Sequence, residues 1–199
     1  MRIAVVNTKG GTGKTSSSIM LAEAARRKGF TVAVIDADPQ GSASKWAEVA
    51  EEAGDPLRFD VTDANRATLA RKIKAANVGY LLIDTAPGDP AIIDAAVSHA
   101  DLTIIPTRTT PADLDRALET YRALSTPAAI LLWNIDSRHQ LYKQARELFE
   151  EEDIVAFGAE IPTREEVNKM WFTSLDFPSL HGYEEVFAEL HEALTTEGE

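Results

Sequence analysis

The sequence contains no cysteine, only four histidines and no long uninterrupted apolar run. Without cysteine there can be no disulfides, thiolate metal sites or iron–sulfur ligands, and the histidines lack metal-ligand spacing. No window approaches the roughly 20 apolar residues that a transmembrane helix needs, and the N-terminus MRIAVVNTKGG reaches its glycines too early for a secretory signal. We therefore expect a cytoplasmic protein that does not use a membrane.

Positive charge is also scarce, because 20 Lys and Arg stand against 32 Asp and Glu, which gives a formal net charge of −12. This balance argues against a protein that coats nucleic acid with its whole surface. Any contact with DNA would have to use a local patch. Three segments are modestly basic, although each one taken singly reads more readily as a solvated helix face: Arg66–Lys74, Arg138–Arg146, and Arg164 with Lys169.

What the sequence does contain is a regular alternation of short aliphatic runs with longer segments of helical apolar spacing. This pattern predicts one α/β domain over residues 1–194, with a mostly parallel sheet of about seven strands flanked by helices on both faces, and a short acidic tail at 195–199. The predicted strands are Arg2–Asn7, Thr31–Asp36, Leu57–Val61, Tyr80–Asp84, Leu102–Pro106, Ala128–Asn134 and Ile154–Phe157. The predicted helices are Lys14–Lys28, Ser42–Ala53, Ala64–Ala75, Ala91–His99, Ala112–Leu124, Gln140–Glu152, Arg164–Phe172 and Tyr183–Leu194.

Loops that follow the strands of such a sheet meet at one edge, because the crossovers between parallel strands are right-handed. Three of these loops carry conspicuous residues. They are KGGTGKTS at 9–16, DADPQG at 36–41 and DTAPG at 84–88. We therefore expect the functional site at this edge of the sheet.

The first of these loops has the composition of a phosphate-binding loop. Gly10, Gly11 and Gly13 allow backbone N–H groups to converge on a polyphosphate, just ahead of the positive end of a helix. Lys14 supplies a full positive charge to the phosphates, and the Thr15 hydroxyl is suited to ligate Mg²⁺. The predicted nucleotide-binding residues of the loop are Lys9, Gly10, Gly11, Thr12, Gly13, Lys14, Thr15 and Ser16.

The loop departs from the common G-x-x-x-x-G-K-[ST] pattern, because Thr8 stands where a glycine is usual and Lys9 follows it. Together with DADPQG and LLIDTAPG, KGGTGKTS resembles the deviant Walker A ATPases, the group that contains ParA, MinD, ArsA and the nitrogenase iron protein. The DADPQGSAS segment and the later IPTREEV (Ile161–Val167) are most similar to ParA partition ATPases, and the short chain resembles the small plasmid-type, ParF-like members. The resemblance covers nearly the whole chain and implies a P-loop NTPase fold that binds ATP or ADP with Mg²⁺.

The resemblance also implies roles for individual charged residues. Lys9 would reach across a dimer interface to the phosphates of the ATP held by the partner, where a second cation neutralises charge built up in phosphoryl transfer. Asp84 matches the Walker B aspartate and, with Thr15 and Asp36, would serve the metal. Asp38 would orient the attacking water. The predicted catalytic residues are Lys9, Lys14, Asp38 and Asp84.

Simpler readings of three of these residues stay open. Lys9 could be a solvated loop lysine, since lysine is common on surfaces. Asp36 or Asp38 could merely cap the helix that starts near Ser42, a frequent use of aspartate after a strand. The division of work between the two aspartates is also left open.

The base-binding residues are predicted from the resemblance as well. Asn134 ends a predicted strand at the ligand edge, where an amide can pair with the donor and acceptor edge of adenine. Ile161, Pro162 and Thr163, together with IPTRTTPAD (Ile105–Asp113), are similar to family segments that border the base. The prolines could equally provide ordinary loop rigidity. Spacing gives no functional prediction for the tryptophans, which read as core or interface aromatics: Trp46, Trp133 and Trp171.

The sequence shows no residues set aside to hold a second substrate, so the leading hypothesis is a molecular switch. The resemblance implies that ATP favours a homodimer, that the dimer binds nonspecific DNA on the nucleoid, and that a ParB-like partner stimulates hydrolysis. The cargo would be a plasmid, a chromosome region or a phage genome. Two alternatives are a P-loop small-molecule kinase or ligase, and a scaffold that uses ATP to dimerise without hydrolysing it.

Overall fold

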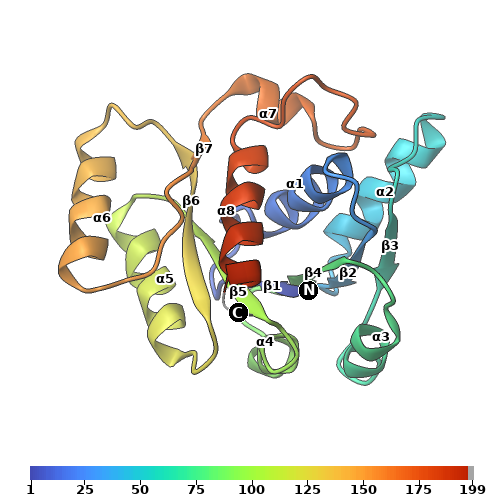
Figure 1. Cartoon of the computed structure of the whole chain (residues 1–199), viewed down its shortest axis with the longest axis horizontal. Coiled ribbons are helices and arrows are strands. Elements are labelled where there is room, and N and C mark those ends of the chain that lie inside the picture. The colour runs from blue at the N-terminus through green and yellow to red at the C-terminus, as the bar shows by residue number, and fades with distance from the viewer. Residues whose placement is uncertain (197–199) are drawn as a thin grey trace.

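The computed structural model describes residues 1–196 as a parallel seven-stranded sheet covered by helices (Figure 1). The strands are β1 (Arg2–Val5), β2 (Val32–Ala37), β3 (Asp60–Asp63), β4 (Tyr80–Thr85), β5 (Leu102–Thr107), β6 (Ala128–Ile135) and β7 (Ile161–Pro162). The helices are α1 (Lys14–Arg27), α2 (Ser42–Glu52), α3 (Leu69–Ala75), α4 (Pro90–Val97), α5 (Pro111–Ala123), α6 (Gln140–Glu151), α7 (Glu165–Lys169) and α8 (Tyr183–Thr196). The predicted α/β class is confirmed. In residues 1–196, no helix combines the length and apolar character that a membrane crossing demands.

Two hydrophobic cores lie on opposite faces of the sheet. One core is formed with α1, α2 and α8 and includes Trp46, Tyr183 and Phe187. The other is formed with α3, α4, α5 and α6 and includes Ile73 and Phe149. Figure 1 shows α8, in red, crossing one face beside α1. Because both faces are covered, the central strands carry apolar side chains in both directions, which is why they appear as continuous aliphatic runs in the sequence.

The strand order β3-β2-β4-β1-β5-β6-β7 places β1 at the centre of the sheet, between β4 and β5. The loop that follows β1 therefore lies at the centre of the sheet edge, with β4 on one side of β1 and β5 on the other. Asp36 of β2 lies directly beside Asp84 of β4 in the register of these two strands. The topology thus brings the three conspicuous loops to the same edge, where parallel α/β sheets bind their ligands.

Two strands are displaced from their predicted positions. We predicted Leu57–Val61, but β3 is Asp60–Asp63, because its position is set by parallel pairing with β2 and an edge strand tolerates polar side chains. The prediction for Ile154–Phe157 was also wrong, since this segment makes only an isolated bridge, from Ala156 to Ile130. The last strand, β7, is Ile161–Pro162, which pairs with β6 across a register shift.

Two helices are shorter than predicted. We predicted a helix over Ala64–Ala75, but α3 begins at Leu69, because the Asn65 side chain accepts hydrogen bonds from the backbone N–H groups of Ala67 and Thr68 and closes a turn there. The predicted helix Arg164–Phe172 is reduced to α7, and Phe172 has a left-handed φ of 63°. At the C-terminus α8 continues to Thr196, and residues 197–199 of the predicted tail lie outside the described residues.

Candidate nucleotide-binding site

The glycine-rich loop after β1 is fastened to the sheet by Asn7. The Asn7 side chain donates a hydrogen bond to the Pro106 carbonyl of β5 at 2.9 Å and accepts one from the Lys9 backbone N–H at 2.8 Å. Gly11 and Gly13 then take left-handed φ values of 71° and 94°. Residues other than glycine are strained at such values, so these two glycines turn the chain into α1.

Gly13 is required for a second reason. A Cβ atom at this position would overlap the indole ring of Trp133, which packs directly against the loop. Trp133 lies near the end of β6 and donates a hydrogen bond from Nε1 to the Tyr183 hydroxyl of α8 at 3.1 Å. The Tyr183 hydroxyl also lies 3.5 Å from the Ser17 hydroxyl of α1. The glycine-rich loop is therefore packed against β6, and Tyr183 of α8 links β6 to the first turn of α1.

Lys14, the first residue of α1, turns back over the loop. Its Nζ donates a hydrogen bond to the Lys9 carbonyl at 3.0 Å, and only 7% of the residue is exposed. Burial lowers the pKa of this amine, while the carboxylates of Asp84 and Asp38 oppose that shift. The nearby carboxylates compensate the charge of the Lys14 ammonium only in part, so this position favours the binding of a polyanion such as a polyphosphate.

Asp84 at the end of β4 is completely buried. Burial raises its pKa to about 7, against the opposing effect of a hydrogen bond from Thr15 and with a further rise from Asp36. Within residues 1–196, neither Asp84 Oδ2 nor Ser16 Oγ has a hydrogen-bond partner. Buried polar atoms are normally paired, so these two oxygens are available to a ligand. A hard divalent cation with oxygen ligands, such as Mg²⁺, fits Asp84 together with the hydroxyls that open α1.

The two aspartates after β2 behave differently from each other. Asp36 is buried, and its carboxylate accepts hydrogen bonds from the backbone N–H groups of Ser44 at 2.7 Å and Asp38 at 3.1 Å. It therefore caps the first turn of α2, as the simpler reading suggested. Asp38 accepts one hydrogen bond, from the Gln40 N–H at 2.9 Å, and its side chain lines the cavity beside the glycine-rich loop. Of the two, Asp38 is the better placed to meet a ligand.

That cavity has a volume of about 320 Å³ and lies between the loop, the start of α2 and the end of β6. It brings together residues from the three motifs, Arg108 of the Ile105–Asp113 segment, and two tryptophans without a predicted functional role. The lining residues are Gly10, Gly11, Gly13, Lys14, Thr15, Ser16, Asp38, Ser42, Pro87, Arg108, Trp133 and Trp171.

Lys9 faces away from this cavity. Together with Thr8, Gly10, Ala112 and Arg116 it lines a separate depression on the α5 side of the loop. Its Nζ forms an ion pair with Asp113 at the start of α5. Lys9 is thus not a free solvated lysine, and the two lysines of the loop point to opposite sides.

Sequence reasoning missed a role for Trp133 and Trp171, and it included Arg108 only as part of the Ile105–Asp113 segment expected to border the base. Arg108 donates a hydrogen bond to the Gly11 carbonyl at 2.7 Å, and its guanidinium carbon lies 5.6 Å from the centre of the Trp133 ring. Trp171 stacks on Trp46 with ring centres 4.8 Å apart and lines the cavity with its exposed part. Arg108 directly follows a strand, so the rule that strand ends converge could have found it, whereas no sequence signal marks the two tryptophans.

The predicted base-binding residues are placed less favourably. Asn134 follows Trp133 at the end of β6, is exposed, and has a left-handed φ of 58°. Ile161 is fully buried under α8, so its side chain cannot touch a ligand in this conformation. Pro162 pairs with Ile135, and exposed Thr163 donates its N–H to the Ile135 carbonyl at 2.8 Å. Within the described chain these four residues lie outside the cavity lining, and a role in base binding stays a prediction.

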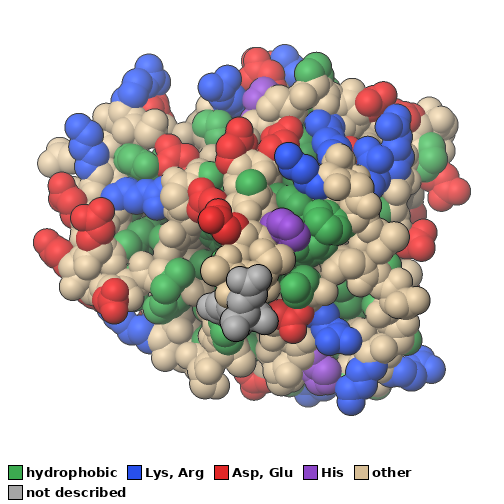
Figure 2. Space-filling model, in the orientation of Figure 1, with side chains coloured by type: hydrophobic (Ala, Val, Ile, Leu, Met, Phe, Trp, Pro, Cys, Tyr) green, Lys and Arg blue, Asp and Glu red, His purple; other side chains and the backbone are tan. Residues whose placement is uncertain are grey.

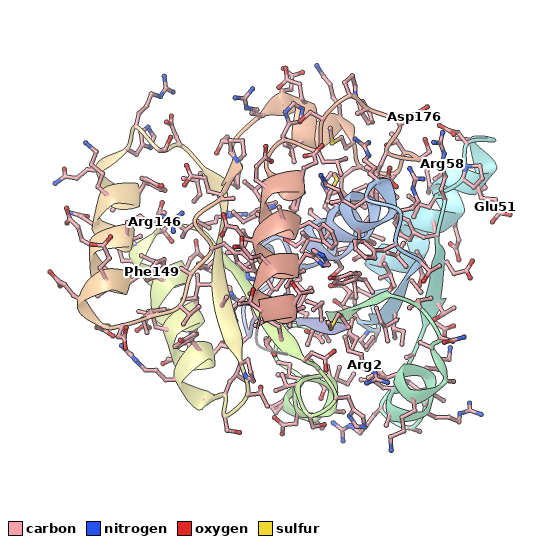
Figure 3. All side chains as sticks on the ribbon, in the orientation of Figure 1. Arg2, Glu51, Arg58, Arg146, Phe149 and Asp176 are labelled. Atoms are coloured by element: carbon pink, nitrogen blue, oxygen red, sulfur yellow. The ribbon has the colours of Figure 1, made fainter. Side chains whose placement is uncertain are left out.

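Several basic residues of the segments predicted as possible DNA contacts form ion pairs within the chain. Arg66 pairs with Asp89, Lys72 with Asp63, Arg138 with Asp136, and Lys169 with Glu165. Figure 3 labels Arg146, which lies on α6. The Arg146 guanidinium donates hydrogen bonds to the carbonyls of Phe157 and Gly158 and so connects α6 to the segment that follows it. On the face that Figure 2 shows, basic and acidic side chains are interspersed.

Comparison with known proteins agrees with this geometry. Residues 3–174 match the family model described as the CobQ/CobB/MinD/ParA nucleotide binding domain. The chain is 38% identical over 143 residues to the maintenance of carboxysome distribution protein A of Gloeobacter kilaueensis, a match that covers 68% of this chain and 64% of that protein. It spans about half the length of several other curated relatives.

Two solved structures show the same fold. The cell division ATPase MinD of Pyrococcus furiosus superposes with a TM-score of 0.77 at 18% identity, covering 96% of this chain and 99% of that one. A putative plasmid partition protein of Borrelia burgdorferi bound to AMPPNP gives a TM-score of 0.73 at 19% identity, covering 96% and 98%. The resemblance read from the motifs is confirmed, and the chain belongs to the CobQ/CobB/MinD/ParA nucleotide-binding domain family.

Proposed function

We propose that this protein is an ATP-hydrolysing switch of the ParA type, which dimerises with ATP and acts in the cytoplasm in the partition of plasmid, chromosome or phage DNA. The observation that carries the proposal is the division between the two lysines of one loop. Lys14 lines the cavity and serves the nucleotide of its own chain. Lys9 lines a depression on the other side of the loop, from which it would reach the nucleotide of a second chain.

The residues of the cavity account for binding and positioning of the nucleotide. Backbone N–H groups of the glycine-rich loop and the Lys14 ammonium would hold the phosphates. Asp84, with Thr15 and Ser16, would hold Mg²⁺, which when bound supplies Lewis-acid stabilisation of the phosphate charge. Asp38 lies at the edge of the same cavity, where its carboxylate would orient a water molecule toward the terminal phosphate.

The relatives support a positioning role and suggest two kinds of cargo. One solved structure is named a plasmid partition protein, which supports DNA as cargo and a ParB-like, centromere-binding partner that stimulates hydrolysis. A curated relative is named for carboxysome distribution, which favours a protein body as the second candidate. DNA contact would use a local patch formed by two copies of the chain, because the chain as a whole carries a formal net charge of −12, and it should weaken steeply with added salt.

The experiment that tests the proposal is a measurement of molar mass for the Asp38→Ala variant with Mg²⁺ and ATP. Removing the carboxylate should block hydrolysis and trap an ATP-bound dimer of twice the 21.7 kDa chain mass. Asp94→Ala, a change of the same type on the exposed side of α4, is the matched control and should behave as the wild type. A monomeric Asp38→Ala variant that has bound ATP would refute the switch.

The two rival functions make different predictions in the same assay. A small-molecule kinase or ligase would release ADP faster when a metabolite, rather than a protein or DNA, is added. A scaffold that does not hydrolyse ATP would dimerise with ATP and release no phosphate with any partner. Slow hydrolysis that rises with partner protein and DNA would favour the proposed switch over both.

A further inference from the structure

The side chain of Lys9 has a defined partner, Asp113, although Lys9 belongs to the glycine-rich loop. The Lys9 N–H donates to Asn7 and its carbonyl accepts from Lys14 Nζ, so the main chain at this position is fixed from both sides. The side chain then extends toward α5, where Nζ pairs with Asp113. The Lys9 side chain is 41% exposed and that of Asp113 only 6%. One half of this ion pair is therefore accessible and the other is buried.

The buried half is held rigidly. Asp113 Oδ2 accepts a hydrogen bond from the Thr110 hydroxyl at 2.7 Å, and Oδ1 faces Lys9. The Asp113 carbonyl accepts another from the Thr107 hydroxyl at 3.1 Å, and its backbone N–H donates to Thr110, the N-cap of α5. Burial acts to raise the pKa of this carboxyl, but hydrogen bonds from Lys9 and Thr110 outweigh it and the pKa is lowered.

This arrangement limits where the Lys9 ammonium can go. An ion pair with a desolvated, hydrogen-bonded carboxylate is stronger than one between two mobile surface groups. To reach a phosphate outside its own chain, Lys9 must first leave Asp113. The buried carboxylate cannot follow it, because α5 and Thr110 hold it in place. A polyphosphate presented by a second chain would therefore compete with Asp113 for the same ammonium.

We propose that Asp113 is a positioning residue that holds Lys9 within its own chain and releases it only to the nucleotide of a partner. The inference rests on the proposed function and adds to it a residue that regulates dimerisation. Asp113 raises the concentration of ATP-bound chain needed for dimerisation, and it recaptures Lys9 once the terminal phosphate has been lost. The two states of the switch then differ in which anion Lys9 neutralises.

The first test measures the accessibility of Lys9 in the nucleotide-free chain. Acylation by an amine-reactive ester, followed residue by residue with mass spectrometry, should modify Lys9 more slowly than the exposed Lys45 of α2. Asp113→Asn keeps an acceptor for Thr110 and removes the charge, and it should speed the labelling of Lys9 by about threefold or more. Asp115→Asn removes the same charge from an exposed position on the same helix and should change nothing. Equal labelling of Lys9 and Lys45 in the wild type would overturn the proposal without any variant.

The second test measures dimerisation with a non-hydrolysable ATP analogue by sedimentation. Asp113→Asn should lower the protein concentration at half-dimerisation by about fivefold to tenfold, because Lys9 no longer has to leave a partner. Asp113→Glu, which restores a carboxylate, should return it toward the wild-type value. In a Lys9→Met background, Asp113→Asn should have no effect. An unchanged midpoint in Asp113→Asn, or the same shift with and without Lys9, would overturn the role of Asp113.

These results separate the inference from the function on which it rests. A wild type that dimerises with the analogue while Asp113→Asn shows neither faster Lys9 labelling nor a shifted midpoint would sink only the inference. A wild type that binds the analogue and stays monomeric at every concentration would sink the proposed function together with the release step. Thermal melting of both Asp113 variants confirms that the comparison is made between folded chains.

Discussion

The two lysines of the glycine-rich loop each face an aspartate, and the two pairs differ in almost every physical respect. Lys14 is buried beside buried Asp84, the pKa of the lysine is lowered and that of the aspartate is raised to about 7. Lys9 is accessible, and its partner Asp113 has a lowered pKa. Burial opposes the charge of both groups on the Lys14 side, which favours an external ligand there, whereas Lys9 and Asp113 form an ion pair within the chain. By this difference, Lys14 is a group that binds the nucleotide of its own chain, and Lys9 is a group that has to change its ion-pair partner before it can act.

The largest expected effect is on the Lys14 side of this comparison. Lys14→Ala removes the main countercharge from a low-dielectric cavity, and we expect the affinity for ATP to fall by at least about 100-fold. Isothermal titration calorimetry with Mg²⁺ and ATP measures this directly. Lys45→Ala, an exposed lysine on α2, serves as the control. Retention of wild-type affinity in Lys14→Ala would contradict the assignment of this lysine to the chain's own nucleotide.

Lys9→Ala should separate catalysis from binding. Because Lys9 lies outside the cavity, ATP affinity should stay within about threefold of the wild type, while hydrolysis should fall by about 100-fold or more, as for a cation supplied by a partner. Calorimetry and phosphate release on the same preparation give both quantities. Equal losses of affinity for Lys9→Ala and Lys14→Ala would show that both lysines act on one nucleotide and would erase the comparison.

Arg108 and Trp133 form part of the wall of the cavity that Lys14 lines. Arg108→Ala removes the contact with the Gly11 carbonyl and the stacking on Trp133, so we expect a loss of about fivefold to tenfold in ATP affinity. Nucleotide binding should also change the tryptophan fluorescence, and Trp133→Phe should reduce that change to the part contributed by Trp171, which lines the same cavity. Arg122→Ala, on the far end of α5, is the control. An unaltered affinity in Arg108→Ala would show that the arginine supports only the loop.

The smallest effect concerns the stability of the free chain. An acid whose pKa is raised by folding stabilises the fold below its unfolded value near 4, and that contribution is lost as the pH rises through about 7. At pH 8 the melting temperature of Asp84→Asn should therefore be higher than that of the wild type, by about 2–4 °C for each kcal/mol of stability regained. At pH 4 the two melting temperatures should be equal. Asp94→Asn should show no such pH dependence. A variant that is equally destabilised at both pH values would contradict the raised pKa.

Much of this organisation could be predicted from the sequence, because it depends on local rules. The glycine-rich loop is predicted by its glycines, by Lys14 and by the buried strand before it. Parallel topology alone brings Asp38 and Asp84 to this loop. The edge strands were misplaced because β3 and β7 are defined by pairing with their neighbours rather than by their own hydrophobicity.

The second partner of each functional group could not be predicted in this way. Asp113 was read only as part of a loop that borders the base, and its pairing with Lys9 depends on how α5 starts relative to β1. Trp133 was read as a core residue, and its contact with Gly13 depends on the packing of β6 against the loop. Such contacts arise from the tertiary arrangement and leave no periodic pattern in the sequence.

The most direct test of the division between the two lysines is a mixing experiment with two inactive variants. The Lys14→Ala chain keeps Lys9 but cannot hold ATP, and the Lys9→Ala chain holds ATP but lacks the lysine for its partner. Mixed dimers would contain one complete site, so the mixture should regain up to about a quarter of wild-type hydrolysis when half of the dimers are mixed. Hydrolysis in the mixture no greater than the sum of the two separate variants would contradict the account.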